Sequence, residues 1–305
     1  MMPAVAPVAT PRGPSPAGPV APQTRPIRAR RATGGMMMAL ATAGTVLAVV
    51  PLVAIGWYLL RRGAEALSPS FFTALPAPVG EPGGGMANAV AGTVLLVGIA
   101  AALGIPVGVG AGLYAAEHRG RPLAATVRFV SEVLSGLPSI LVGVFVWEFL
   151  VRPAHHFSAL AGGIALAVIM LPLVARATEE FLLLVPVSLF ETALALGYSR
   201  WRAAIHVVLR TALPGIVTAV LVALARVAGE TAPLLFTAFG NQYWSFSLRE
   251  PVSALPLQIY TYAISPYDEW QSLAWAGALV LLGMSLAFSV AARIATRHRH
   301  GRRDR

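Results

Sequence analysis

The chain has 305 residues, of which 56% are hydrophobic and 12% are charged, and its mean hydropathy is +0.70. About a quarter of the residues of a typical soluble protein are charged, so this composition excludes an ordinary water-soluble domain. The sequence contains no cysteine, which excludes disulfides and thiolate metal sites.

All 23 basic residues are arginine, because the sequence contains no lysine. The P-loop motif that binds nucleotides requires a lysine to reach the phosphates, so if ATP drives this protein, a separate chain must bind it. The net charge of +10 would suit a nucleic-acid ligand, but the arginines form short clusters between long apolar runs. Membrane orientation explains such clusters better, since short cytoplasmic loops hold an excess of arginine.

Residues 1–35 contain eight prolines, five arginines and almost no large apolar side chains. This composition predicts a disordered cytoplasmic tail rather than a signal peptide, whose apolar core would lie much nearer the start. The first apolar run, residues 36–60, is long enough to cross a hydrocarbon core, which takes about 20 helical residues. We expect residues 61–87 to form an external loop.

Five further membrane spans are predicted from the apolar runs that follow. They lie at about residues 88–115, 125–150, 160–178, 206–236 and 272–295. Six spans place both termini on one side of the membrane. With both termini in the cytoplasm, eighteen arginines lie in cytoplasmic segments and four lie outside, which favours that orientation. The membrane domain, residues 88–296, then contains a cytoplasmic loop at 179–205 and precedes a basic tail at 297–305.

The second span carries Gly104, Gly108 and Gly112 at four-residue spacing, with Pro106 between them. Small residues at this spacing clear a stripe along which another helix can approach closely. Glycine and proline are also common in membrane helices in general, and the sequence leaves this second explanation open. Both explanations predict a helical bundle.

The third span contains Ser135, Pro138 and Ser139, which are candidates for a helix break or a pore lining. An intramembrane protease would need a histidine to activate Ser135, and the predicted membrane interior holds none. We expect Pro138 instead to break or bend the span, which frees backbone carbonyl groups that the bundle or pore water must satisfy. His155 and His156 have no carboxylate or third ligand nearby, so no metal site is predicted.

The cytoplasmic loop between the fourth and fifth spans contains the run PVSLFETALALGYSRWR. Ser188 and Glu191 form a capping-box pattern, so we expect a short helix to begin at Ser188. Its apolar residues follow helical spacing, and Trp201 lies where the segment closes. An amphipathic helix in such a loop either rests on the membrane surface or docks into a partner protein, and the sequence leaves both open.

Arg226 and Glu230 lie inside the fifth predicted span, in the run ALARVAGETAPLLF. A charge near the middle of a membrane helix costs about 2.5 to 3.5 kcal/mol on insertion scales, so it persists only when paired, facing protein or lining water. Four residues apart on a helix, the two side chains share a face and can form an internal ion pair. The alternative is that they line the path of a substrate. Arginine suits an oxyanion because its planar fork donates parallel hydrogen bonds to two oxygens.

Four stretches of the sequence resemble a known family. Glu191, Ala193 and Gly197 match the EAAxxxG core of the cytoplasmic loop in ABC importer permeases, with threonine at the second position. The IxLP ending of that loop is incomplete, because Arg210 stands where its proline is expected. More specific are SGLPSILVG, GETAPLLFTA and LPLQIYTYAISPYDEWQ, which resemble the PstA family of permease subunits in phosphate-specific ABC importers. The resemblance covers residues 88–295.

The resemblance implies an all-α integral membrane protein of six transmembrane helices with the type I ABC importer permease (MetI-like) fold. It also implies a subunit of an ATP-driven, binding-protein-dependent importer of inorganic phosphate, which forms half of the translocation pathway and is not an enzyme. Glu191, Ala193 and Gly197 would belong to a coupling helix that docks into an ATP-binding subunit. Arg226 and Glu230 match the charged pair that the family places in the path. Glu230 would accept a hydrogen bond from a protonated phosphate and repel a fully deprotonated anion such as sulfate.

The partners and the location follow from the same resemblance. The expected partners are a homologous permease subunit (PstC-like), two ATP-binding subunits (PstB-like), an external phosphate-binding protein (PstS-like) and membrane lipid, with no nucleic acid. No cofactor is expected in this chain, because the partner subunits bind ATP. We expect a multi-pass protein of the bacterial inner membrane. The alternatives are a permease for another oxyanion, a secondary transporter and a purely structural or signalling membrane protein. A secondary transporter should show paired broken helices in an inverted repeat, which we do not detect. A structural or signalling protein would explain the spans but not the charged pair together with the capped cytoplasmic helix.

Overall fold

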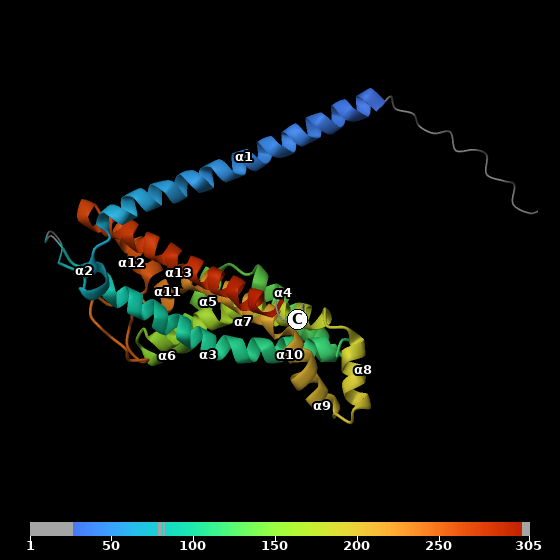
Figure 1. The fold of residues 1–305 in the computed structure, drawn as a ribbon. Coiled ribbons are helices and arrows are strands. Elements are labelled where there is room, and N and C mark those ends of the chain that lie inside the picture. Colours follow the sequence, from blue (N-terminus) through green and yellow to red (C-terminus); the bar gives the residue numbers. More distant parts are fainter. Residues whose placement is uncertain (1–26, 79–80, 82, 301–305) are drawn as a thin grey trace, which may run out of the picture. The chain divides into compact units, whose positions relative to one another are not determined.

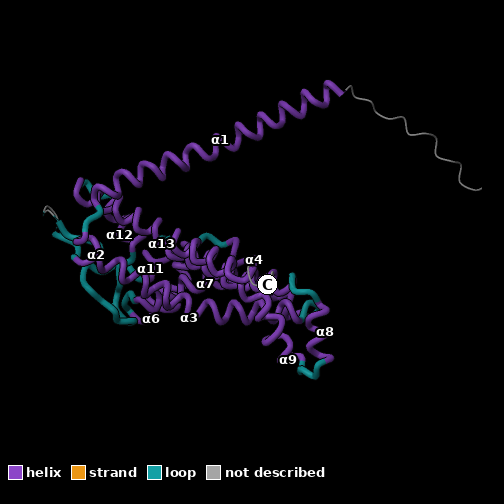
Figure 2. The backbone as a smooth tube through the Cα atoms, viewed as in Figure 1, coloured by secondary structure: helices purple, strands orange, loops and turns teal. Residues whose placement is uncertain are grey.

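The computed structural model describes residues 27–78, 81 and 83–300. In these ranges the chain is mainly helical, and its only β feature is an isolated bridge between Phe239 and Val252 (Figure 2). The predicted all-α fold is therefore confirmed.

The chain divides into two compact units, and the first, Met1–Gly56, contains most of helix α1, Ile27–Ala66. Residues 1–26 of the predicted disordered tail lie outside the described residues. The helix begins at Ile27, earlier than the predicted start at residue 36, so the end of the predicted tail is helical. Its apolar part is long enough to cross a membrane, as predicted for the first span.

The second unit, Trp57–Arg305, contains the end of α1 and all the other helices (Figure 1). Their bounds are α2 Pro69–Thr73, α3 Ala87–Glu117, α4 Pro122–Gly136, α5 Ser139–Val146, η1 Trp147–Val151, α6 Arg152–Ala154, α7 Ala159–Leu183, α8 Val187–Ala195, α9 Arg200–Ala203, η2 Ala204–Leu209, α10 Arg210–Ala228, α11 Ala232–Thr237, α12 Leu255–Ala263 and α13 Asp268–His300. The segments η1 and η2 are π-helical. Helices α8 and α9 lie at one end of this unit, here called the α8 end, and α2 lies at the other, the α2 end (Figure 1).

Five helices in the described part of the chain are long and apolar enough to span a membrane, and a sixth span results if the bent pair α4 and α5–α6 counts as one. Six predicted spans therefore have counterparts in the structure. The fifth prediction, a continuous helix over 206–236, is wrong, because α10 ends at Ala228 and α11 begins at Ala232. Gly229 terminates α10, and the proline in the first turn of α11 suits a helix start, where its missing N–H costs nothing.

Helices α3 and α7 form the centre of the bundle and touch along the predicted glycine stripe. All three glycines are buried on α3. A Cβ added to Gly108 would lie 2.8 Å from the Cβ of Val174, and one added to Gly112 would lie 2.7 Å from the Cβ of Thr178. Gly104 is less tight, at 3.4 Å from the Ala167 carbonyl oxygen. The explanation by close helix approach is confirmed.

The α2 end is closed by α2, which lies in the predicted external loop 61–87, together with α12. Phe71 of α2 is fully buried beside Met86, Leu255 of α12 and Ala276 of α13. Tyr262 of α12 joins the same cluster, and its burial raises the pKa of its hydroxyl, an effect that a hydrogen bond with Gln258 opposes. Apolar burial therefore fixes α12 on the bundle even though it is too short to span a membrane.

Candidate functional site

The third span is broken between α4 and α5, as predicted for Pro138. The chain bends by 104° between the two halves. Leu137 has extended backbone angles, φ −76° and ψ 136°, which is the conformation that a following proline imposes. Ser135 and Pro138 are exposed at the bend, and Ser139 is partly exposed at the start of α5. The predicted break is confirmed, whereas the pore-lining role of the three residues stays a prediction.

The second break, between α10 and α11, is joined to the first by packing of α5 on α11. Gly143 of α5 lies so close to Pro233 of α11 that an added Cβ would be 2.6 Å from the proline Cα. Both residues are buried. The structure thus brings together SGLPSILVG and GETAPLLFTA, two motifs that stand far apart in the sequence.

Arg226 and Glu230 lie on opposite sides of the point where α10 ends. Arg226 occupies the last turn of α10 and is exposed, while Glu230 follows Gly229 in the break and is partly exposed. No ion pair joins Arg226 to Glu230 among the residues that the structure describes. The internal ion pair required both residues on one helix face, and the end of α10 at Ala228 removes that register. The internal ion pair is therefore absent from the described structure. The alternative, that the two side chains line the path of a substrate, stays a prediction.

The short helix predicted in the loop after α7 is present as α8, but its start differs from the prediction. The helix begins at Val187, and Pro186 takes the position before it without a side-chain cap. Ser188 already lies inside the helix, where its carbonyl accepts a hydrogen bond from Thr192. The capping box with Glu191 is therefore wrong: Pro186, whose ring fixes φ, precedes the helix, and α8 begins at Val187, one residue before Ser188.

Helix α8 ends in a Schellman motif built on Gly197. Gly197 has φ +86°, its N–H donates to the Leu194 carbonyl, and the Tyr198 N–H donates to the Ala193 carbonyl. A residue in this left-handed conformation is usually glycine. Ala193 is buried under the loop, whereas Glu191 is exposed. Large apolar side chains also remain exposed around α8, namely Leu184, Val187, Leu196 and Trp201.

Comparison with known proteins places this architecture in a family. The model of the family described as "Binding-protein-dependent transport system inner membrane component" matches residues 108–300. The phosphate transport system permease protein PstA of Yersinia pestis is 42% identical over 266 residues, which cover 87% of this chain and 90% of that relative. The chain belongs to the PstA family of permease proteins.

The fold of this PstA-family chain is similar to those of solved ABC transporters. The MetNI methionine ABC transporter, in an inward-facing conformation, contains a chain with a TM-score of 0.52 at 22% identity, covering 68% of this chain and 93% of that one. The bacterial alginate ABC transporter, solved with an alginate-bound periplasmic protein, gives a TM-score of 0.57 at 16% identity, covering 88% and 96%. The predicted MetI-like permease fold is confirmed.

A groove of about 490 Å³ opens beside the second break of this PstA-family chain. Gly229 and Thr231 from the break line it together with Tyr260 of α12 and Ser285 of α13. The remaining lining is mostly apolar. Sequence reasoning missed these hydroxyl groups as site candidates, although the motifs GETAPLLFTA and LPLQIYTYAISPYDEWQ contain two of them.

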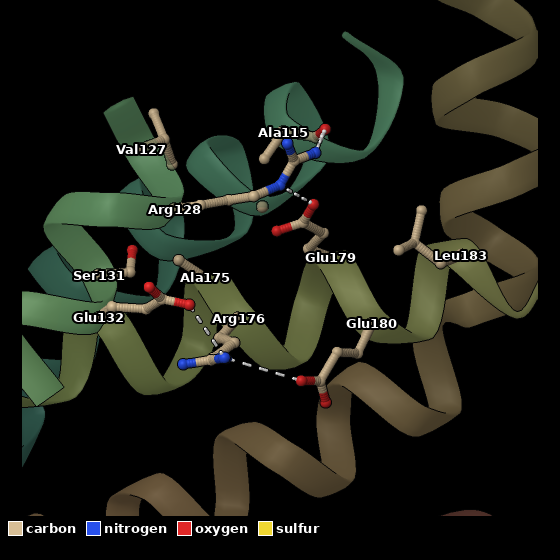
Figure 3. A pocket seen from close by; sticks show the side chains of 11 residues that line it. Ala115, Val127, Arg128, Ser131, Glu132, Ala175, Arg176, Glu179, Glu180 and Leu183 are labelled. Atoms are coloured by element: carbon tan, nitrogen blue, oxygen red, sulfur yellow. Dashed lines mark hydrogen bonds and ion pairs between the residues drawn. The ribbon is translucent and has the colours of Figure 1, made fainter. Parts of the chain in front are cut away.

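The PstA-family chain also contains a charged network between α4 and α7 that no sequence pattern predicted (Figure 3). Arg128 of α4 donates through Nε to Glu179 of α7 at 2.6 Å and through Nη2 to the carbonyl of Ala115 in α3 at 2.8 Å. Arg176 of α7 contacts Glu132 of α4 at 3.3 Å. These residues line a pocket of about 170 Å³. Arg128 and Glu179 are 51 positions apart, so no local sequence pattern could reveal the pair.

No group of three or more potential metal-binding side chains occurs in the part of the chain that the structure describes. His155 has a left-handed backbone at φ 60°, and the ring of His156 contacts the carbonyl of Phe157. The two adjacent histidines therefore act as turn residues in the segment that leads into α7.

Proposed function

We propose that this chain is one half of the translocation pathway of an ATP-driven, binding-protein-dependent importer of inorganic phosphate. Its membership in the PstA family supports this proposal, and the matched relative is a phosphate transport system permease protein. The five or six candidate spans supply the membrane-crossing scaffold. The chain itself contributes no covalent chemistry.

The observation that carries the proposal is the position of Arg226. Its side chain is exposed at the end of α10, and it has no ion-pair partner within the described residues. A charged group in a membrane protein persists in such a place only when it faces water or another protein surface. The guanidinium fork matches two oxygens of a phosphate anion. We therefore assign Arg226 to the wall of the path, where it attracts and orients the anion.

Glu230 supplies selectivity in this proposal. Phosphate near neutral pH still carries a proton, which can be donated to a carboxylate, whereas sulfate carries none. Because Glu230 is not neutralised by Arg226, its charge repels an anion that cannot donate. Ser135, Pro138 and Ser139 at the first break are assigned to the same path.

ATP is bound by other subunits in this proposal. A chain without lysine cannot form the P-loop. Helix α8 offers exposed apolar side chains together with exposed Glu191, which suits docking into a groove of an ATPase subunit better than isolation in water. Two PstB-like ATPase subunits would drive the cycle, a PstC-like permease would complete the pathway, and a PstS-like binding protein would deliver phosphate.

The α8 end is assigned to the cytoplasm. Arginines cluster in the segments that belong to this end, including Arg119, Arg121, Arg200 and Arg202. The positive-inside rule assigns such a cluster to the cytoplasmic side. Both termini would then be cytoplasmic, and α2 and α12 would face the binding protein.

The test is uptake of radiolabelled phosphate by proteoliposomes that hold the assembled complex. Uptake should require internal ATP, the added binding protein and this chain, and excess sulfate should not reduce it. A complex that lacks this chain, assembled from the other subunits, is the control. Uptake without ATP would indicate a secondary transporter, and competition by sulfate would indicate a permease with broader oxyanion specificity. Either result would overturn the proposal.

A further inference from the structure

Helix α4 is attached to the rest of the bundle by charged contacts rather than by apolar burial. The only buried residues of α4 are Ala124 and Ser131. Its large apolar side chains Leu123, Phe129 and Val133 are exposed by 57%, 65% and 46%. Few side chains of α4 therefore pack against its neighbours, and within a membrane such packing and polar contacts are what hold helices together.

Two charged pairs join α4 to α7, Arg128 with Glu179 and Glu132 with Arg176, and of the two arginines Arg128 makes the shorter contact (Figure 3). Its Nε donates to Glu179 at 2.6 Å while its Nη2 donates to the carbonyl of Ala115 at 2.8 Å. That carbonyl belongs to the last turn of α3, where backbone carbonyls lack helical partners and a cation is favoured. The pair is partly shielded, since the side chains of Arg128 and Glu179 are 33% and 13% exposed. One side chain thus links α4 to both α3 and α7.

The other half of the third span is attached in a different way. Helix α5 packs on α11 through the close approach of Gly143 to Pro233. The bend before Pro138 thus separates α5, which is held by close packing, from α4, which is held by charged contacts. Helix α5 also packs on α7, but near its start at Ala161 and Ala165, whereas α4 is held near its end at Glu179.

Glu179 lies near the end of α7, which stops at Leu183 just before α8 begins at Val187. Residues 184–186 are the whole connection between the two helices. From Glu179, a hydrogen-bonded contact leads directly to Arg128 and α4. The contact thus stands between the proposed ATPase-docking helix and the broken span.

We propose that Arg128 is a positioning residue that transmits movement of the α7–α8 corner to the bend at Pro138 by keeping α4 fixed to α7. This inference rests on the proposed function, because it requires ATP-driven transport. Arg128 contacts no substrate in this scheme. Its loss separates ATP hydrolysis from phosphate movement.

The first test measures phosphate uptake and ATP hydrolysis together in proteoliposomes that hold the full complex. Arg128→Gln should lower the phosphate moved per ATP about fivefold or more, the low end of typical coupling between sites, while hydrolysis continues. Arg128→Lys keeps the charge but lacks the planar fork that reaches both Glu179 and Ala115. Its ratio of phosphate moved to ATP hydrolysed should therefore lie between those of the unsubstituted complex and Arg128→Gln. Arg61→Gln is the matched control, because its pair with Glu65 is exposed by 73% and 62% and contributes little.

If Arg128→Gln lowers uptake and hydrolysis equally, Arg128 is merely structural. If it lowers neither, no link runs through Arg128. Both results would overturn the inference. Absence of uptake by the unsubstituted complex would instead refute the proposed function itself.

A second test does not depend on how Arg128→Gln folds. The chain contains no cysteine, so a single Ser131→Cys substitution reports on the buried face of α4 without background from this chain. Because α4 stays with α7, this thiol should resist a water-soluble maleimide both at rest and in the ATP–vanadate-arrested complex. Ser135→Cys, on the same helix but exposed, is the labelling control. Labelling of residue 131 that appears only with ATP and vanadate would show that α4 leaves α7, which contradicts the link.

Discussion

Gly143 and Pro233 join the two helix breaks of this permease, because the glycine lets α5 approach the backbone of α11 at the proline. An added Cβ would lie 2.6 Å from the Pro233 Cα, a distance that requires backbone to shift. The break that carries Pro138 and the break that follows Arg226 are therefore parts of one packed unit. A shift of the backbone at one break should therefore displace the backbone at the other.

Gly143→Ala should disturb this unit. We expect a destabilisation of about 1–3 kcal/mol, typical of overpacking in a filled core, together with reduced phosphate uptake. The measurement is the thermal unfolding midpoint of the purified complex, followed by uptake. Gly98→Ala on α3 is the control, since nothing lies within 4 Å of its added Cβ. Equal behaviour of the two variants would contradict the packing argument.

The glycine stripe on α3 predicts a graded series of alanine substitutions. Gly112→Ala should lower the unfolding midpoint most, because its Cβ would meet the Ala175 carbonyl and Thr178. Gly108→Ala should follow, and Gly104→Ala, whose nearest contact is at 3.4 Å, should cost least. Gly110→Ala has open space and serves as the reference. A reversed order would show that approach of α7 is not what the stripe serves.

Gly197 is required for its backbone conformation and not for space, since nothing lies within 4 Å of an added Cβ at φ +86°. Gly197→Ala should therefore destabilise the end of α8 by about 1–2 kcal/mol, the cost of the left-handed conformation for a residue with a Cβ. Gly197→Asn should cost less, because asparagine is tolerated at this position of the motif. Uptake should decrease in the same order. Equal uptake by both variants would argue against the Schellman motif as the reason for this glycine.

Arg226 and Glu230 should behave as independent residues in stability measurements. Because no ion pair joins them among the described residues, Arg226→Gln and Glu230→Gln should not show the coupling of about 0.5–3 kcal/mol in the free energy of unfolding that residues of one salt-bridge network show. A double-mutant cycle on purified protein measures the coupling. A favourable coupling of that size would restore the internal ion pair as the explanation of these charges.

Much of the scaffold follows from the sequence in physical terms. Apolar runs predicted the six spans, Pro138 predicted the first break because proline removes a backbone donor, and the glycine spacing predicted the α3–α7 contact. The second break was missed because a single glycine within an apolar run, Gly229, does not by itself end a helix. Pro233 then serves as the start of α11, which only the structure reveals.

The side-chain network was beyond prediction for a different reason. Arg128 and Glu179 belong to spans that pack together in three dimensions but carry no shared local pattern. Likewise, Ser188 and Glu191 fit a capping box by spacing, yet Pro186 already sets the start of α8. Local patterns therefore identified the elements, while the contacts between elements decided which charges are paired and which are exposed.

The most direct test of the account is ATP-dependent phosphate uptake by the complex carrying Arg226→Gln, with normal assembly verified by copurification of its subunits. Arg210→Gln is the matched control, because Arg210 is exposed on the same helix, α10, but at its opposite end. Uptake should be lost with Arg226→Gln and retained with Arg210→Gln. Normal uptake by the Arg226→Gln complex would show that this side chain does not serve the phosphate path, and the assignment of the site would be wrong.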